Sequence, residues 1–245
     1  PLAVDTVQLA LGPGSHNLVV ETYDASGPAQ IALSIHHLMP DFDVTYIART
    51  PRYDRYNVSY EYGVDPAEPE TGRPYLTAQE QAKQRWPNPG EMVTYTGHVK
   101  NIGVISGVCG YKWFFDGVEV ASGVTTTLAP GEEFTATYAR PWDSEQRTHL
   151  IRFTADPAND VSEGREDNNS LEDATNAMSF GLHVWRSLYD WFAANARSYS
   201  DVVSFDQWAQ RNFARMNAMF SEAVFPGTPQ GVPERVRIDE IVIEP

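Results

Sequence analysis

An acidic, asparagine-rich run holds the residues whose types and spacing best suit a chemical role. Its side chains are Asp156, Asp160, Glu163, Glu166, Asp167, Asn168 and Asn169. Several oxygen ligands on one loop are what a hard cation such as calcium requires, although the spacing is not that of a helix-loop-helix calcium site. Short polar side chains in such a run are equally typical of turns, where they accept hydrogen bonds from nearby backbone amides. We favour this structural role, with no cofactor. Calcium bound by Asp156, Asp160, Glu163, Glu166 and Asp167 is the alternative.

The sequence offers no catalytic residue. No pair among the six histidines has the spacing of a zinc metalloprotease helix, and His36 and His37 would point to opposite faces of a strand. A Gly-x-Ser-x-Gly elbow and a phosphate-binding loop are both missing from the sequence, and Cys109 lies in an apolar strand pattern typical of a buried, inert thiol. We therefore expect no enzyme activity from this chain.

A tyrosine-rich stretch is the second candidate for binding. Tyr56, Tyr60 and Tyr62 have the same parity, so in an extended strand they would line one face and offer a stacking platform for a carbohydrate. Packing of the same face against a neighbouring sheet explains the pattern equally well, and we favour packing.

The elements that must position the acidic run lie in residues 90–173. Apolar residues alternate through Val93, Tyr95 and Val99, and Asp116-Gly117 has the sequence of a two-residue hairpin turn. About seven short strands at this spacing favour an antiparallel β-sandwich. We expect Trp113, or its neighbours Tyr111 and Phe115, in the core. The strands predicted around this hairpin span residues 108–115, 124–128, 134–138 and 150–155.

Several motifs in this region occur in the order expected for a known family. They are Gly90-Glu91, Asn101-Ile102-Gly103, Phe115-Asp116-Gly117, Leu128-Ala129-Pro130-Gly131, Trp142 and the run from Asp156 to Asn169. The segment resembles the CARDB domain, a cell-adhesion-related, immunoglobulin-like module of extracellular prokaryotic proteins. The resemblance implies fold and compartment better than it implies function.

Residues 1–39 hold two or three strand runs, too few for an independent domain. The runs that carry a resemblance are Val7-Gln8-Leu9, Gly14-Ser15-His16-Asn17-Leu18, Tyr23-Asp24 and Ala29-Gln30-Ile31-Ala32-Leu33. They resemble the C-terminal end of the protective-antigen-type β-barrel domain of bacterial toxins, adhesins and glycosidases.

The pattern changes from β to helical after Asp173. Met178, Leu182, Trp185, Leu188 and Phe192 recur at helical spacing, which predicts a first helix. Ser204 is the predicted cap of a second helix, which has Gln207 at its third position. The apolar face predicted for that helix is Phe205, Trp208, Phe213, Met216, Phe220 and Val224. We expect the two helices to pack on the sandwich or on the tyrosine-rich stretch, and residues 235–244 to form a strand.

Composition sets the remaining limits. The 245 residues carry a formal charge of −15, which disfavours nucleic acid and anionic membrane surfaces as partners. The expected fold is mostly β with a helical segment: an immunoglobulin-like antiparallel sandwich, a partial β-domain and a C-terminal helical hairpin. The expected order is the protective-antigen-like part (1–39), an irregular linker with a strand at Asp43–Ile47 and a short helix (40–89), the sandwich (90–173), the hairpin (174–228) and a strand leading into a further β-domain (229–245).

The predicted function is structural. We expect a non-catalytic adhesion or assembly module of a large extracellular prokaryotic surface protein, of which this chain is an internal fragment. Its partners would be proteins, or further copies of itself, at the cell surface. The alternative is an ancillary, carbohydrate-binding region of a secreted glycosidase or peptidase. Direct membrane insertion is not expected, because no apolar run approaches the roughly 18 residues that span a bilayer.

Overall fold

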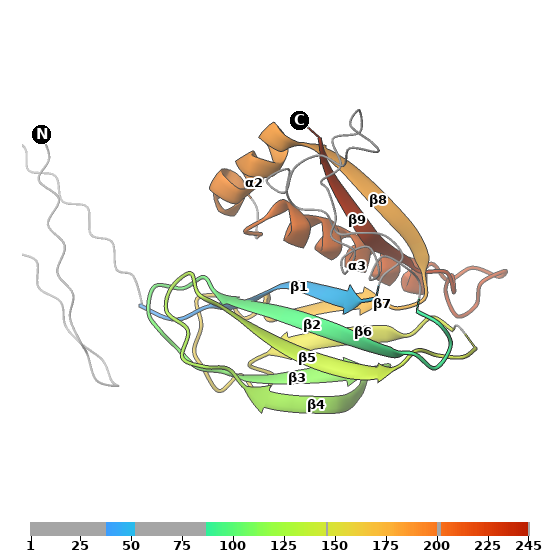
Figure 1. Cartoon of the computed structure of the whole chain (residues 1–245), viewed down its shortest axis with the longest axis horizontal. Coiled ribbons are helices and arrows are strands. Elements are labelled where there is room, and N and C mark those ends of the chain that lie inside the picture. Colours follow the sequence, from blue (N-terminus) through green and yellow to red (C-terminus); the bar gives the residue numbers. More distant parts are fainter. Residues whose placement is uncertain (1–37, 52–86, 146, 200–201, 245) are drawn as a thin grey trace, which may run out of the picture. The chain divides into compact units, whose positions relative to one another are not determined.

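The computed structural model describes residues 38–51, 87–145, 147–199 and 202–244, which lie in one compact unit, Leu38–Pro245. The fold is mostly β, with antiparallel sheets and two helices near the C-terminus, as the sequence predicted (Figure 1). The protective-antigen-like motifs and the tyrosine-rich stretch lie outside the described residues, so both interpretations stay predictions.

Seven strands form a sandwich of two antiparallel sheets. The three-stranded sheet has the order β1 (Phe42–Thr50), β2 (Met92–Asn101), β5 (Glu133–Pro141). The four-stranded sheet has the order β4 (Val118–Val124), β3 (Gly110–Phe115), β6 (Leu150–Ala155), β7 (Ser170–Ala174). The β3–β4 turn has φ of 48° at Asp116 and 79° at Gly117, the left-handed conformation that a two-residue hairpin needs.

The core between the sheets is apolar and follows the predicted alternation. Val93, Tyr95 and Val99 on β2 are at most 2% exposed, and Trp113 on β3 is fully buried. The Trp113 ring lies 4.6 Å from the ring of Phe153 on β6. The prediction that Trp113 or a neighbour is buried is confirmed. The predicted strand at 124–128 is wrong, because β4 ends at Val124 and only Leu128 pairs, in an isolated bridge with Gly107.

The first strand of the sandwich is the one predicted at Asp43–Ile47, which the sequence analysis assigned to the linker and not to the sandwich. β1 pairs with β2 along its whole length, from Phe42 opposite Asn101 to Thr50 opposite Thr94. An irregularity between Val44 and Tyr46 changes which parity faces the core. Phe42 and Val44 precede it and Ile47 follows it, and all three are buried in the core. A local pattern cannot reveal pairing between segments fifty residues apart.

The C-terminal part is not a simple helical hairpin. It has the order β8 (Met178–Trp185), α2 (Arg186–Tyr199), α3 (Phe205–Glu222), β9 (Val236–Glu244). β8 and β9 pair in parallel, which requires a long crossover, and the two helices form it. The helix predicted from Met178 is therefore wrong over its first part. Apolar and polar residues also alternate over residues 178–185. Leu182 and Val184 pack in an apolar cluster with residues of the helices and β9, and the segment pairs with β9 as a strand.

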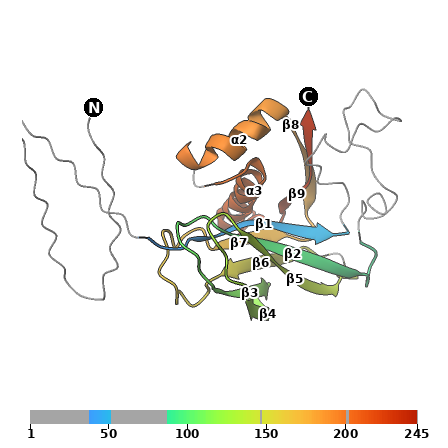
Figure 2. The same cartoon turned by 60° about the vertical axis from the view of Figure 1, so that its left-hand side comes forward.

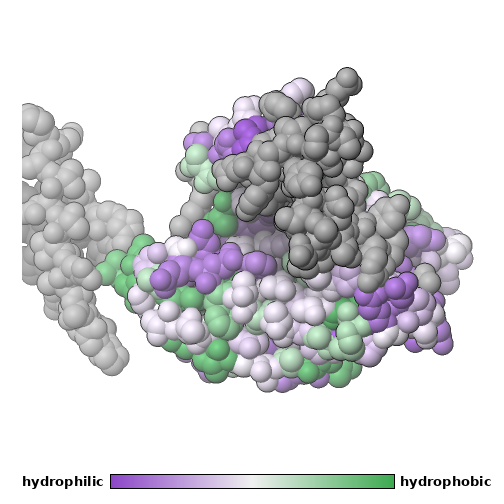
Figure 3. All heavy atoms as spheres, in the orientation of Figure 1, coloured by the Kyte–Doolittle hydropathy of each residue, from purple (hydrophilic) through white to green (hydrophobic). Residues whose placement is uncertain are grey.

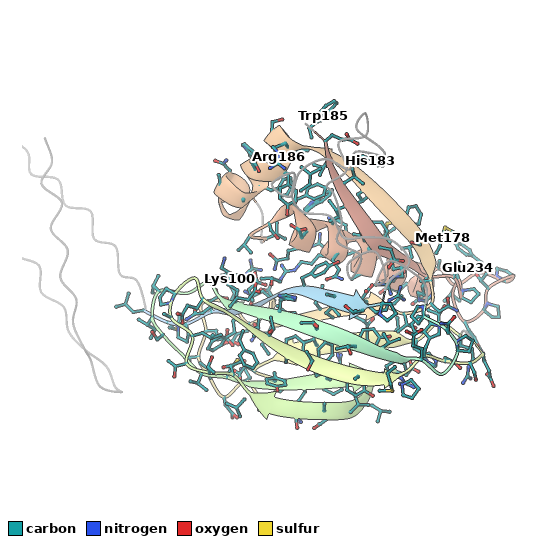
Figure 4. All side chains as sticks on the ribbon, viewed as in Figure 1. Lys100, Met178, His183, Trp185, Arg186 and Glu234 are labelled. Carbon is teal, nitrogen blue, oxygen red and sulfur yellow. The ribbon has the colours of Figure 1, made fainter. Side chains whose placement is uncertain are left out.

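The cluster between the helices and the β8–β9 pair is apolar. Its buried members are Val184, Phe205, Ala209, Ile238, Ile241 and Ile243. Figure 4 shows Trp185 and His183 near one end of β8, and Met178 with Glu234 near the opposite end. We refer to β8, α2, α3 and β9 together as the C-terminal unit.

α3 packs against β1 and β7 of the sandwich as well as β9 (Figures 1 and 2). β1 and β7 are edge strands of the two sheets, so α3 covers both open edges on one side of the sandwich. The predicted packing on the sandwich is confirmed for α3, whereas α2 packs on α3, β8 and β9. On the sandwich face visible in Figure 3, hydrophobic residues are scattered among hydrophilic ones.

Candidate functional site

Asp156 begins the acidic loop between β6 and β7 and organises its first turn. Its φ is 40°, and its N–H donates to the carbonyl of Gly110 at 2.8 Å. Its carboxylate accepts the N–H groups of Asp160 at 3.2 Å and Val161 at 2.9 Å. These are hydrogen bonds of the kind that the sequence analysis predicted for a turn.

Glu163 connects the same loop to β1. The side chain is buried; one carboxylate oxygen accepts the N–H of Phe42 and the other accepts Nδ2 of Asn169 at 2.7 Å. Burial raises the pKa of Glu163 to about 7, and the neighbouring Glu166 and Asp156 add to this against the two hydrogen bonds. The loop therefore holds the start of β1 through a carboxylate that is only partly ionised near neutral pH.

Three of the five candidate residues of the calcium alternative come together. One carboxylate oxygen from each of Asp156, Glu163 and Glu166 lies within 4.8 Å of the other two. Glu166 is exposed, and its Oε1 accepts the N–H of Glu163 at 3.1 Å. Asp160 and Asp167 are not part of this group. Asp167 binds the guanidinium of Arg165 at 2.7 Å, which lowers the pKa of its carboxyl.

The two asparagines at the end of the loop are buried and close it onto the sheets. The carbonyl of Asn168 accepts the N–H of Val44 at 3.1 Å, and that of Asn169 accepts the N–H of Ala155 at 2.8 Å. Nδ2 of Asn168 donates to Asp41 at 2.6 Å. Their side-chain oxygens are buried without a hydrogen-bond partner.

The remaining candidate groups do not form a reactive constellation in the described ranges. There, Asp156, Glu163 and Glu166 are the only group of three or more His, Cys, Asp or Glu side chains close enough to share a metal ion. Cys109 is 2% exposed, and burial raises its pKa to about 11, so its thiol is protonated at neutral pH. His98, His149 and His183 each contact carboxylates. His16, His36 and His37 lie outside the described residues.

Between the sandwich and the C-terminal unit lies a set of buried polar residues that the sequence analysis missed. We call it the polar joint: Asp43, Arg49, Asp173, Gln207, Gln210, Arg211, Arg237 and Asp239. Each of them except Arg211, which is partly exposed, has at most 7% of its surface exposed. The available signal was weak: charged residues inside otherwise apolar strand runs, such as Arg237 and Asp239 in residues 236–244.

One half of the polar joint holds β1 against α3. Nε2 of Gln207 donates to both carboxylate oxygens of Asp43, at 2.7 and 2.8 Å. Arg211 donates to the same carboxylate at 2.7 Å. Gln210 accepts the N–H of Ile47 at 2.8 Å and donates to its carbonyl at 2.9 Å, so this side chain pairs with the strand edge as a neighbouring strand would.

The sequence analysis assigned the wrong face of α3 to the sandwich. Trp208 and Met216 of the predicted apolar face are 39% and 37% exposed, whereas Gln207 and Gln210 are buried. The physical reason is that an edge strand presents backbone groups that need donors and acceptors, which apolar side chains cannot supply. The predicted cap is confirmed: Oγ of Ser204 accepts the N–H of Gln207 at 3.1 Å.

The other half of the polar joint holds β9 against β7 and β1. Nη1 of Arg237 donates to the carbonyls of Ala174 and Thr175 at 2.7 and 2.9 Å, and its Nε donates to Asp239 at 2.9 Å. Asp239 also pairs with Arg49 at 3.4 Å. Burial lowers the pKa of Arg237, but Asp239 and Asp173 outweigh it and keep the guanidinium charged.

A family model matches the region of the sandwich. Residues 73–173 match the family model of the CARDB domain, which extends through β7 and includes the whole acidic loop. The chain contains a CARDB domain. The CARDB domain is a non-catalytic module. β1 precedes the matched range, although it completes the three-stranded sheet.

Three solved structures are similar to this chain, each with a TM-score of 0.40 or less. One is a CARDB domain from Pyrococcus furiosus in complex with di-metal ions, with 18% identity, a TM-score of 0.40, and coverage of 58% of this chain and 96% of that one. A solution structure of a Pyrococcus furiosus CARDB domain has 26% identity, a TM-score of 0.33, and coverage of 36% and 81%. A domain of a protein from Methanosarcina acetivorans, provisionally named a cell surface protein, has 24% identity, a TM-score of 0.31, and coverage of 34% and 73%.

No curated protein matches the chain. Within the part of the chain that the structure describes, no helix is long and apolar enough to cross a membrane. The acidic loop and Asp173 lie within the matched range. The other residues of the polar joint come from β1, which precedes that range, and from α3 and β9, which follow it.

Proposed function

We propose that this chain is a non-catalytic structural module, used for adhesion or assembly, of a large extracellular prokaryotic surface protein. The main support is the polar joint, through which α3 and β9 are fixed to the β1 and β7 edges of the CARDB sandwich. Covered edges do not pair with strands of other chains, which suits a module that works at high local concentration. Buried hydrogen bonds and ion pairs also specify one arrangement of the two parts, as a spacer requires.

A calorimetric melt of the whole chain tests this proposal. If the sandwich and the C-terminal unit act as one block, they should unfold together, and amides of α3 and β9 should exchange as slowly as those of β2 and β3. Light scattering on the same sample reports self-association, and pull-down on isolated prokaryotic cell envelopes reports adhesion. Separate melting of the C-terminal unit, together with no self-association and no envelope binding, would contradict the proposal.

The alternative is an ancillary, carbohydrate-binding region of a secreted glycosidase or peptidase. Its candidate residues, Tyr56, Tyr60 and Tyr62, lie outside the described residues. A glycan array probed with the whole chain, with a Tyr60→Ala variant beside it, separates the two roles. Specific glycan binding that the variant loses would favour the alternative. Turnover of a glycoside or peptide by the chain alone would contradict both.

A further inference from the structure

The carboxylates of Asp156, Glu163 and Glu166 lie close together without a basic partner. Within the described ranges, none of the three forms an ion pair, and the nearest donors to them are backbone amides and the Asn169 side chain. Two of these carboxylates are buried, where repulsion between like charges is screened far less than in water. The group therefore needs a positive charge, a shared proton, or both.

A second observation, independent of the carboxylates, concerns the side chain of Asn169. It is 7% exposed, and its Nδ2 donates to Oε1 of Glu163 at 2.7 Å, so the side chain lies against the acidic group. Its Oδ1 is buried and has no hydrogen-bond partner. A buried carbonyl oxygen left unpaired costs about 1–3 kcal/mol, and a neutral amide oxygen is a ligand that hard cations accept.

The spacing fits one ion. Calcium takes oxygen ligands at about 2.3–2.6 Å, so two oxygens on opposite sides of it are about 4.8 Å apart. The three carboxylate oxygens lie within 4.8 Å of one another, and all can therefore contact a single ion. Hydrogen bonds to backbone amides hold Asp156 and Glu163 in place, and a carboxylate oxygen that accepts one N–H still has a lone pair for a cation.

We propose that Asp156, Glu163 and Glu166, with the amide oxygen of Asn169, bind one calcium ion. Glu166 is exposed, so the ion enters from the solvent side and water completes its coordination. Magnesium fits less well, because it demands near-octahedral ligands and gives up its water reluctantly. Since Glu163 also binds the N–H of Phe42, the ion would fasten the acidic loop to the start of β1.

Calorimetric titration of the whole chain with calcium, and melts with and without chelator, test this proposal. Sodium chloride at equal ionic strength is needed as a reference, because a chain of charge −15 is stabilised by any cation. We expect one binding event and a melting temperature that rises with free calcium; at a hundred times the dissociation constant the folding equilibrium shifts about a hundredfold.

The loop supplies its own matched controls. Glu166→Gln removes an exposed ligand and should weaken calcium binding at least about tenfold without impairing folding, because only the N–H of Glu163 depends on it. Asp167→Asn removes the same charge from the next position, outside the group, and should bind calcium as the parent does. Absence of binding heat, or equal responses of the two variants, would overturn the proposal. Any stabilisation by calcium would then come from charge screening.

Discussion

The sandwich core and the polar joint are both buried, but they are built from opposite kinds of residue. In the core, Trp113 lies on Phe153 among aliphatic side chains. At the joint, Asp43 receives hydrogen bonds from Gln207 and Arg211, and Arg237 fills the space between Asp239 and the end of β7. Apolar packing is tolerant of direction, whereas each polar contact requires one partner at one angle. The core therefore supplies stability, and the joint supplies a defined arrangement.

The largest effect is expected in the core. Trp113→Ala should lower the free energy of unfolding by about 3–5 kcal/mol, since it removes a fully buried ring and leaves a cavity. Trp113→Phe should cost much less, because the indole N–H that it removes is buried without a partner. Urea denaturation measures both, with Val118→Ala, 65% exposed, as the control. Equal losses for Trp113→Ala and Val118→Ala would contradict the core assignment.

How well each region could be predicted follows from the same difference. The alternation at Val93, Tyr95 and Val99 and the turn at Asp116-Gly117 are local signals, and they predicted the sandwich and its core correctly. β8 satisfied both a helical and an alternating pattern, and only its pairing with β9, more than fifty residues away, decides between them. No local pattern could show which of the two structures forms.

The two groups of polar residues also differ in how well the sequence could predict them. The acidic loop was visible as a cluster in sequence, and of the five candidates for the calcium alternative the structure brings together Asp156, Glu163 and Glu166. The polar joint was invisible, because Asp43 and Gln207 are 164 residues apart and each alone is typical of an exposed position. Buried polar pairs depend on tertiary geometry, and a single sequence does not carry it.

Within the polar joint, the largest effect is expected at Arg237. Arg237→Met keeps most of the volume but removes the guanidinium from Asp173, from two carbonyls and from Asp239, which keeps Arg49 and the Ser179 hydroxyl. Breaking a buried pair in this way should cost about 3 kcal/mol. The loss should appear first as faster hydrogen exchange in α3 and β9, while β2 and β3 stay protected. Uniform loss of protection across both parts would mean that the joint and the core unfold as one.

A surface pair gives the contrast for that variant. Lys112 and Glu119 lie 2.8 Å apart, but their side chains are 38% and 45% exposed. Lys112→Met should therefore change the free energy of unfolding by less than about 1 kcal/mol, because water screens the pair. If Lys112→Met cost as much as Arg237→Met, burial would not be what makes the joint contacts matter.

The effect most specific to the joint is the pH dependence of Asp43. Burial raises the pKa of this carboxyl from 3.8 to about 6, although Arg211 and Gln207 favour the ionised form. A raised pKa means that the folded state binds the proton more tightly than the unfolded state does. The stability contributed by this group is then complete below about pH 4 and is lost as the pH rises through 6, a change of at most about 3 kcal/mol.

Asp43→Asn removes that titration while keeping an oxygen that Gln207 can bind. Unfolding free energies of the parent and the variant, measured between pH 4 and pH 7, should show the variant becoming more stable relative to the parent as the pH rises.

The opposite sign is equally informative. If the variant falls behind as the pH rises, the ion pair with Arg211, 2.7 Å away, outweighs burial and holds the pKa of Asp43 below its usual value. The joint would then be a stabilising salt bridge that strengthens above pH 4. With the sign that we expect, burial of the Asp43 carboxylate lowers the stability of the fold, while its hydrogen bonds specify one arrangement of α3 on β1. The joint differs from the core in this respect.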